Sequence, residues 1–167
     1  MNGEDLDCAP GGVNDILAHK LGLYDVQVIA PKGTDSNGHA WGLLRMGLLE
    51  EQPLEQFLHH VKNQLGCDGL KYVNSGKSVR RVAVGGGSCA SELLQVVHAG
   101  CDTFVTSDIK YNQFWDAKSY GINLIDAGHF HTEVPVTAYL AEQISREFPE
   151  VSVVLSQVQS DCAKFFQ

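Results

Sequence analysis

The stretch from Val79 to Ser107, "VRRVAVGGGSCASELLQVVHAGCDTFVTS", decides the fold class. It opens with one β-type apolar run, "VRRVAV" (79–84), and closes with another, "TFVTS" (103–107). Between them Gly85-Gly86-Gly87-Ser88 leads into "CASELLQVVHAG", whose apolar spacing predicts a helix. A strand, a crossover helix and a second strand form the unit that pairs strands in parallel. We therefore expect a parallel sheet from Val79 onward.

The same alternation continues on both sides of this unit. Downstream we expect a short helix in "YNQFWDAKSYG", a strand at 123–126, a longer helix in "TEVPVTAYLAEQISREFP" and a last strand, "VSVVLS", at 151–156. Upstream we expect helices within 11–22 and 50–66 and strands at 26–31, 41–49 and 69–73. The polar segment "KGTDSNGHA" (32–40) is the candidate boundary between two lobes of one unit. The prediction is a single α/β unit with a mixed, largely parallel sheet and helices on both faces.

Composition limits the class of protein. The 167 residues are 44% hydrophobic, which is enough for a packed core, and the formal net charge is −8. This charge argues against a nucleic acid or an anionic membrane as partner, because both are bound by clustered Lys and Arg. The five cysteines are odd in number and form no CxxC pair, which fits free thiols in a reducing cytosol. No apolar run approaches the roughly 18 residues of a membrane span, and the acidic start "MNGEDLDCAPGG" is no signal peptide, so we expect a cytosolic protein.

Ligands of parallel sheets bind at the carboxyl ends of the strands. Three loops of this chain occupy that position: "GGGSC" (85–89), "TSDIKY" (106–111) and "DAGHFHTE" (126–133). These loops contain most of the candidate site residues.

The loop "DAGHFHTE" leaves two interpretations open on spacing alone. His129 and Glu133 are four residues apart, so on a helix that begins near His129 both project from one face and could share a metal ion. Asp126 could be a further ligand, or it could orient the imidazole. Alternatively, Glu133 is an acid in the first helical turn and Asp126 or Thr132 is a cap. His131 is offset from His129 and is interpreted as a neighbour of the site.

The other two loops are also ambiguous. The glycines Gly86 and Gly87 could present backbone N–H groups to a phosphate, but a tight turn explains them equally well. Asp108 could position water or a base and Lys110 could contact an anion. In the alternative, Asp108 turns the backbone and Lys110 stays in solvent.

Four segments together resemble one family. The segments "LDCAPGGVNDILAHKLGL" (6–23), "VRRVAVGGGS" (79–88), "AGCDTFVTSDIKY" (99–111) and "GINLIDAGHFHTE" (121–133) are similar in order and wording to the Nif-three-like family, also called GTP cyclohydrolase I type 2 homologues. The resemblance implies a two-lobed α/β protomer with a dinuclear metal site and assembly from dimer to toroidal hexamer. By the same resemblance, Asp7, His129 and Glu133 match metal ligands.

The sequence also departs from the family pattern. The family has an adjacent His-His pair in a segment before Asp7, and this sequence starts after it. Ser107 and Asn112 stand where family members have glycine and histidine. With three ligands instead of a full set, we expect a metal-poor or singly occupied site, because two close cations need more donors.

The resemblance implies a metal-dependent hydrolase. Zinc, manganese or iron would activate water against a small, phosphorylated or nucleotide-like substrate, and Gly86, Gly87, Asp108 and Lys110 are candidate substrate or anion contacts. Whether the chain is an active enzyme is left open. The alternative is a non-catalytic metal-binding or regulatory scaffold with a vestigial site.

Overall fold

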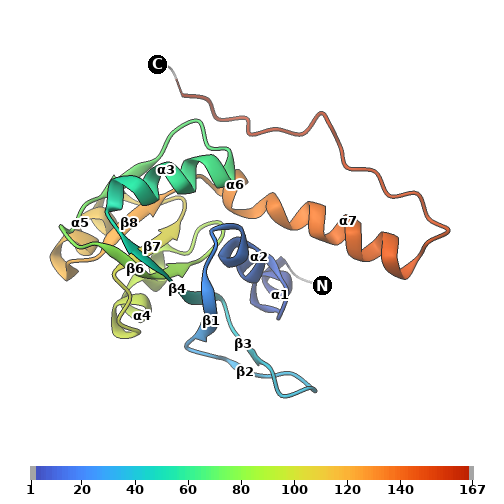
Figure 1. Cartoon of the computed structure of the whole chain (residues 1–167), viewed down its shortest axis with the longest axis horizontal. Coiled ribbons are helices and arrows are strands. Elements are labelled where there is room, and N and C mark those ends of the chain that lie inside the picture. The colour runs from blue at the N-terminus through green and yellow to red at the C-terminus, as the bar shows by residue number, and fades with distance from the viewer. Residues whose placement is uncertain (1–2, 166–167) are drawn as a thin grey trace.

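The computed structural model describes the backbone of residues 3–165 and the side chains of residues 6–165. The strands are β1 (Tyr24–Ile29), β2 (Gly33–Thr34), β3 (Ala40–Trp41), β4 (Leu44–Gln52), β5 (Lys71–Val73), β6 (Val79–Val84), β7 (Thr103–Thr106) and β8 (Asn123–Asp126). The helices are α1 (Gly3–Cys8), α2 (Val13–Lys20), α3 (Leu54–Leu65), the 3₁₀ helix η1 (Ala90–Glu92), α4 (Leu93–His98), α5 (Tyr111–Tyr120), α6 (His129–Glu133) and α7 (Pro135–Glu147). Figure 1 shows the helices arranged around one main sheet.

The main sheet has six strands in the order β1-β4-β6-β7-β8-β5. Strands β6, β7 and β8 pair in parallel, as the stretch beginning at Val79 predicts. Strands β4 and β1 extend the sheet in antiparallel fashion on one side, and β5 pairs antiparallel with β8 at the other edge. The mixed α/β fold is confirmed, but three of the five pairings in this sheet are antiparallel, and the parallel part is limited to β6–β7–β8. Strands β2 and β3 form a separate small hairpin around the polar segment 32–40, and the lobe boundary proposed there stays a prediction.

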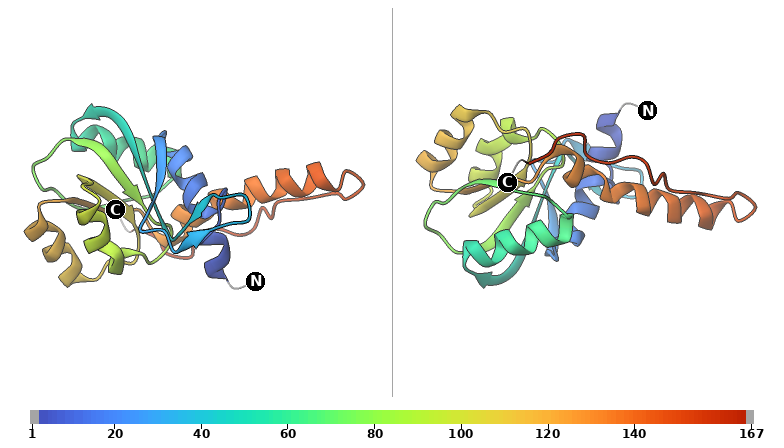
Figure 2. Two further views of the ribbon diagram at one scale, coloured as in Figure 1. Left: turned by 90° about the horizontal axis from the view of Figure 1, so that it is seen from below. Right: turned by 90° about the horizontal axis from the view of Figure 1, so that it is seen from above.

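Both faces of the sheet are covered because the buried strands are apolar on both sides. In β6, Val82 packs in a cluster with α2 and α3, whereas the next residue, Ala83, packs with α4 and α5. In β7, Val105 packs in the cluster with α2 and α3, and Phe104 packs in the cluster with α4 and α5. All four of these side chains are fully buried. Each fully buried Val or Phe contributes about 1.5–3 kcal/mol, so the two layers together stabilise the parallel core. Figure 2 shows the helices on opposite sides of the sheet, as predicted.

The predicted strand at residues 151–156 is wrong. Helix α7 points away from the sheet, and the chain after it returns along the helix as an extended segment (Figure 1). The chain therefore leaves α7 far from a sheet edge that could accept another strand. Three of the four apolar residues in 151–156, Val151, Val154 and Leu155, are exposed, and Val154 has 82% of its surface exposed. The alternating apolar pattern of this segment has no sheet to pack on.

No helix of the described residues is long and apolar enough to cross a membrane. The cytosolic location stays a prediction.

A buried arginine joins the N-terminal segment to the sheet. Arg45 in β4 is 2% exposed, and its Nε and Nη2 atoms donate to the two carboxylate oxygens of Asp15 at 2.6 and 3.1 Å. The same guanidinium donates to the carbonyl oxygens of Gly42 and Ala9. Because the guanidinium is a rigid fork with five donors, one side chain fixes both helix α2 and the chain before it.

Replacing Asp15 with alanine should destabilise the protein strongly. The substitution leaves the buried Arg45 charge without its carboxylate, which costs about 3 kcal/mol of unfolding free energy. Urea denaturation measures the change. The matched control is Glu142→Ala, which removes an ion pair to Arg146 whose side chains are more than 60% exposed, and it should cost at most about 0.5 kcal/mol. Equal losses in the two variants would contradict the role of the Arg45 contact.

Candidate metal centre

The backbone of Gly87 joins the loops that follow the three parallel strands. Its N–H donates to Thr132 Oγ1 at 3.0 Å, in the loop and helix after β8. Its carbonyl oxygen accepts from Thr106 Oγ1 at 3.1 Å and Ser107 Oγ at 2.7 Å, at the end of β7. The three loops selected from the sequence therefore meet at one edge of the sheet.

His129 lies at the centre of this edge, between two carboxylates. Helix α6 begins at His129, so His129 and Glu133 share one helix face as predicted. The Nε2 atom of His129 is 3.0 Å from Glu133 Oε1, and the Nδ1 atom is 2.6 Å from Asp108 Oδ2. Since a carboxylate only accepts, Asp108 fixes the proton on Nδ1 and leaves Nε2 directed at Glu133.

This arrangement favours the protonated imidazole. The pKa of His129 is raised, chiefly by the hydrogen bond to Asp108 and further by the negative charge of Glu133, against an opposing effect of burial. Because the pKa is higher in the folded protein, protonated His129 stabilises the fold at pH values below the ordinary histidine pKa of about 6.5. This contribution is lost as the pH rises through the folded-state pKa. A cation at Nε2 competes with that proton, so metal binding should strengthen with pH.

The space around the His129–Glu133 pair depends on Gly87. A Cβ atom on Gly87 would collide with Glu133 Oε1 and lie 3.2 Å from His129 Nε2. Gly87 also has φ +63°, a conformation that side chains disfavour. The missing side chain leaves a small recess where an imidazole nitrogen and a carboxylate oxygen converge. These are ordinary donors for zinc, manganese and iron, so this pair fits a divalent cation.

Asp7 approaches the same edge through Asn14. The fully buried Asn14 carboxamide donates to the carbonyl oxygens of Asp7 at 3.1 Å and Leu43 at 2.6 Å, and its oxygen accepts from the Gly86 N–H at 2.6 Å. Helix α1 is thereby connected to the loop that contains Gly87.

The two predicted carboxylate ligands also act on one neighbour. The pKa of Cys89 is raised to about 12, mainly by burial, and the charges of Asp7 and Glu133 both add to the shift. Asp7 and Glu133 therefore lie in one electrostatic neighbourhood.

The structure brings two of the three predicted ligands into contact. Among the side chains of residues 6–165, no three from His, Cys, Asp and Glu converge as a metal site requires. The pair is His129 and Glu133, with Asp7 on the adjoining segment. Asp108 instead binds the far nitrogen of His129, the usual position of a residue that orients a metal-binding imidazole.

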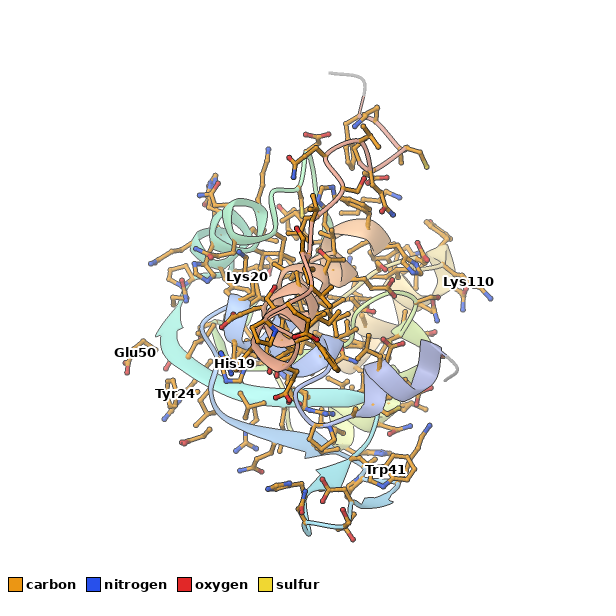
Figure 3. All side chains as sticks on the ribbon, turned by 90° about the vertical axis from the view of Figure 1, so that its right-hand side faces the viewer. His19, Lys20, Tyr24, Trp41, Glu50 and Lys110 are labelled. Atoms are coloured by element: carbon orange, nitrogen blue, oxygen red, sulfur yellow. The ribbon has the colours of Figure 1, made fainter. Side chains whose placement is uncertain are left out.

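The remaining candidate contacts have other surroundings. The N–H groups of Gly86 and Gly87 already donate to Asn14 and Thr132, so an anion would have to displace these bonds. Lys110 precedes α5, and its side chain projects outward at the edge of the molecule (Figure 3). Of the proposed anion contacts, Lys110 is the one with a positive charge, and it is exposed.

His131 and Asp126 take structural roles. The ring of His131 contacts Leu65 O through Nδ1 and Asp161 through Nε2. Asp126 accepts from the N–H of Gly128, which closes the turn before α6.

Sequence reasoning missed Asn14 and considered Thr132 only as a helix cap, whereas α6 has no side-chain cap and Thr132 accepts from the N–H of Gly87. Both are almost completely buried polar side chains, and they anchor the backbone of the glycine loop. The sequence contains a signal for Asn14. This residue precedes the buried Leu17 and Ala18 by three and four positions, so it lies on the apolar face of α2. A carboxamide on an apolar face requires buried partners.

Comparison with known proteins identifies the family. A model described as Duf34/NIF3 (NGG1p interacting factor 3) matches residues 5–162. The chain belongs to this family. A relative from Nostoc sp. (strain PCC 7120), named GTP cyclohydrolase 1 type 2 homolog, is 34% identical over 166 residues. That alignment covers 97% of this chain and 61% of the relative, so the chain spans about three-fifths of the relative's length.

Two solved structures have the same fold. Hypothetical protein SA1388 of Staphylococcus aureus superposes with a TM-score of 0.86 at 24% identity, covering 97% of this chain and 66% of that one. A Bacillus cereus protein related to NIF3 gives a TM-score of 0.85 at 24% identity, covering 97% and 72%.

The titration of His129 tests the arrangement around it. In metal-free protein, the ring proton signals of His129 should titrate with a pKa above the ordinary 6.5. The substitution Asp108→Asn should lower this pKa, because Asp108 is the main cause of the shift. Proton NMR measures both midpoints, and the other histidines serve as internal references. An unchanged midpoint in Asp108→Asn would show that the Asp108 contact is absent in solution.

Proposed function

We propose that Asp7, His129 and Glu133 bind a divalent cation (zinc, manganese or iron) and that this centre hydrolyses a small substrate. The observation that carries the proposal is the contact between His129 Nε2 and Glu133 Oε1, with Asp108 holding Nδ1. When bound, a cation supplies Lewis-acid activation of water and of the bond to be broken.

The protein's own residues have separate tasks in this proposal. Asp108 keeps the His129 tautomer whose Nε2 lone pair faces the cation. Glu133 supplies negative charge, and Gly87 leaves the recess open. Asn14 keeps the Asp7 segment against the glycine loop. Each task is a positioning role that exists before a cation arrives.

The substrate class in the proposal is small, phosphorylated or nucleotide-like. The name of the Nostoc relative, GTP cyclohydrolase 1 type 2 homolog, supports this class. Lys110 is the proposed anion contact, because its charge lies at the periphery beside the Asp108 loop. We also expect assembly from dimer to hexamer, and exposed apolar side chains beyond α7, such as Phe148 and Val158, agree with contacts between copies.

Manganese binding should depend on the space that Gly87 provides. We expect at most one Mn²⁺ per chain, with affinity about tenfold lower in Gly87→Ala, because the new Cβ displaces Glu133 and His129. The EPR signal of free Mn²⁺ in a titration measures the number of ions bound per chain and their affinity. Two tightly bound ions per chain would contradict the proposed single site.

The control for this titration is Gly66→Ala. Gly66 has φ +67° but open space around it, so alanine there carries the backbone cost of about 1 kcal/mol without the collision. Its Mn²⁺ affinity should equal that of the unchanged protein. Equal losses in Gly66→Ala and Gly87→Ala would mean that general destabilisation, and no local collision, weakens binding.

The alternative proposal is a non-catalytic metal-binding or regulatory scaffold. The observation that favours it is the convergence of only two of the three expected ligands among the described side chains.

Turnover separates the two functions. With Mn²⁺, Zn²⁺ or Fe²⁺ supplied, the enzyme should hydrolyse GTP or bis(p-nitrophenyl) phosphate, and Glu133→Ala should reduce the rate about 100-fold or more. Release of product at fixed protein concentration measures the rate, and Glu142→Ala is the control for loss of a glutamate elsewhere. Mn²⁺ binding without turnover of either substrate would favour the scaffold.

A further inference from the structure

A cavity of about 680 Å³ lies beside the His129–Glu133 pair. One wall consists of α6, α7 and the residue between them, and it includes both His129 and Glu133. The other wall is the returning segment 154–162, which follows α7 by several residues. A helix that directly follows the parallel sheet and a segment much later in the chain thus line one cavity beside the candidate metal centre.

The returning segment is attached at two points. Asp161 Oδ2 lies 3.4 Å from His131 Nε2, and both side chains are less than a quarter exposed. His131 is itself fixed, because its Nδ1 donates to Leu65 O at 3.2 Å. Further on, the ring of Phe165 lies against the backbone of Gly69. These contacts come from side chains and need no strand pairing, so an extended segment can lie over the site.

The cavity walls have a distinct chemical character. Five of the lining residues carry hydroxyl or carboxamide groups: Thr137, Ser156, Gln157, Gln159 and Ser160. Apolar side chains such as Val136 and Leu155 line the rest. The carboxylates are Glu133 and Asp161, and none of the described residues that line the cavity is Lys or Arg.

We propose that segment 154–162 is the substrate-selecting wall of this site and that the part of the substrate in contact with this wall is uncharged or cationic. This inference rests on the proposed function, since it concerns the ligand of the same centre. Hydroxyl and carboxamide groups pair with neutral polar groups, and the apolar surface accepts a ring or an alkyl part. Because none of the described residues that line the cavity is Lys or Arg, a phosphate does not lie against segment 154–162. It has two places to lie, against the proposed cation at His129 and Glu133 or outside the cavity on the side of Lys110.

The rate at which thiol reagents modify Cys162 can report the charge of the cavity that segment 154–162 lines. Cys162 lines the cavity and is exposed, whereas the other four cysteines are buried. Burial raises the pKa of Cys67 to about 11 and those of Cys89 and Cys101 to about 12, which suppresses their reactive thiolates. A thiol reagent therefore modifies Cys162 selectively, and peptide mass spectrometry verifies the position.

The experiment compares a cationic and an anionic methanethiosulfonate on the full, metal-free chain at low salt. We expect the ratio of cationic to anionic modification rates at Cys162 to exceed the ratio for glutathione. Glu133→Gln should lower the ratio about twofold, because it removes a charge across the cavity. The control Glu142→Gln, on the exposed side of α7, should leave it unchanged. Rates with neutral methyl methanethiosulfonate correct for altered accessibility.

Each result has one meaning. A ratio equal to that of glutathione, or one insensitive to Glu133→Gln, overturns the proposed wall. If Glu133→Gln lowers the ratio but added Mn²⁺ does not, the wall is supported and the metal centre fails. If Mn²⁺ lowers the ratio in the unchanged protein by about twofold or more, a cation binds inside the cavity that segment 154–162 encloses.

Discussion

The structure of the candidate site depends on the backbone of one residue, Gly87. Its N–H and carbonyl groups bind Thr132, Thr106 and Ser107, so the loops after β6, β7 and β8 have one common contact. Its lack of a side chain leaves the recess beside Glu133. Strand pairing alone brings three loops to the same edge, but only buried hydrogen bonds fix their relative positions. A glycine at φ +63° can provide both the bonds and the space.

The two carboxylates around His129 favour a positive charge on its ring. His129 contacts one carboxylate through each ring nitrogen, and its raised pKa reflects the excess of negative charge around it. A proton or a metal ion can satisfy Nε2 and Glu133, while Asp108 keeps Nδ1 in either state. The net charge of −8 agrees with a centre that attracts cations.

Two peripheral segments complete the site from opposite ends of the chain. Asn14 and the buried Arg45 hold the Asp7 segment on the sheet. The segment beyond α7 returns over His129 and is attached through Asp161. The segment after β8 therefore positions His129 and Glu133, and the less regular segments form the surroundings of this pair. This division is typical of α/β proteins, whose functional residues lie in loops on a rigid sheet.

The sequence by itself determined the alternating elements from Val79 to Glu147 and the shared helix face of His129 and Glu133. Both depend on spacings of a few residues, because the local backbone geometry of a helix or strand decides which nearby side chains share a face. It failed at residues 151–156, because apolar alternation cannot tell whether a sheet edge is within reach. Only the tertiary structure decided that Asp108 binds His129, 21 residues away, and that Asn14 binds Gly86, 72 residues away. It also brought segment 154–162 over the site. These contacts join residues whose proximity is created by packing of the whole chain, and no local pattern encodes that proximity.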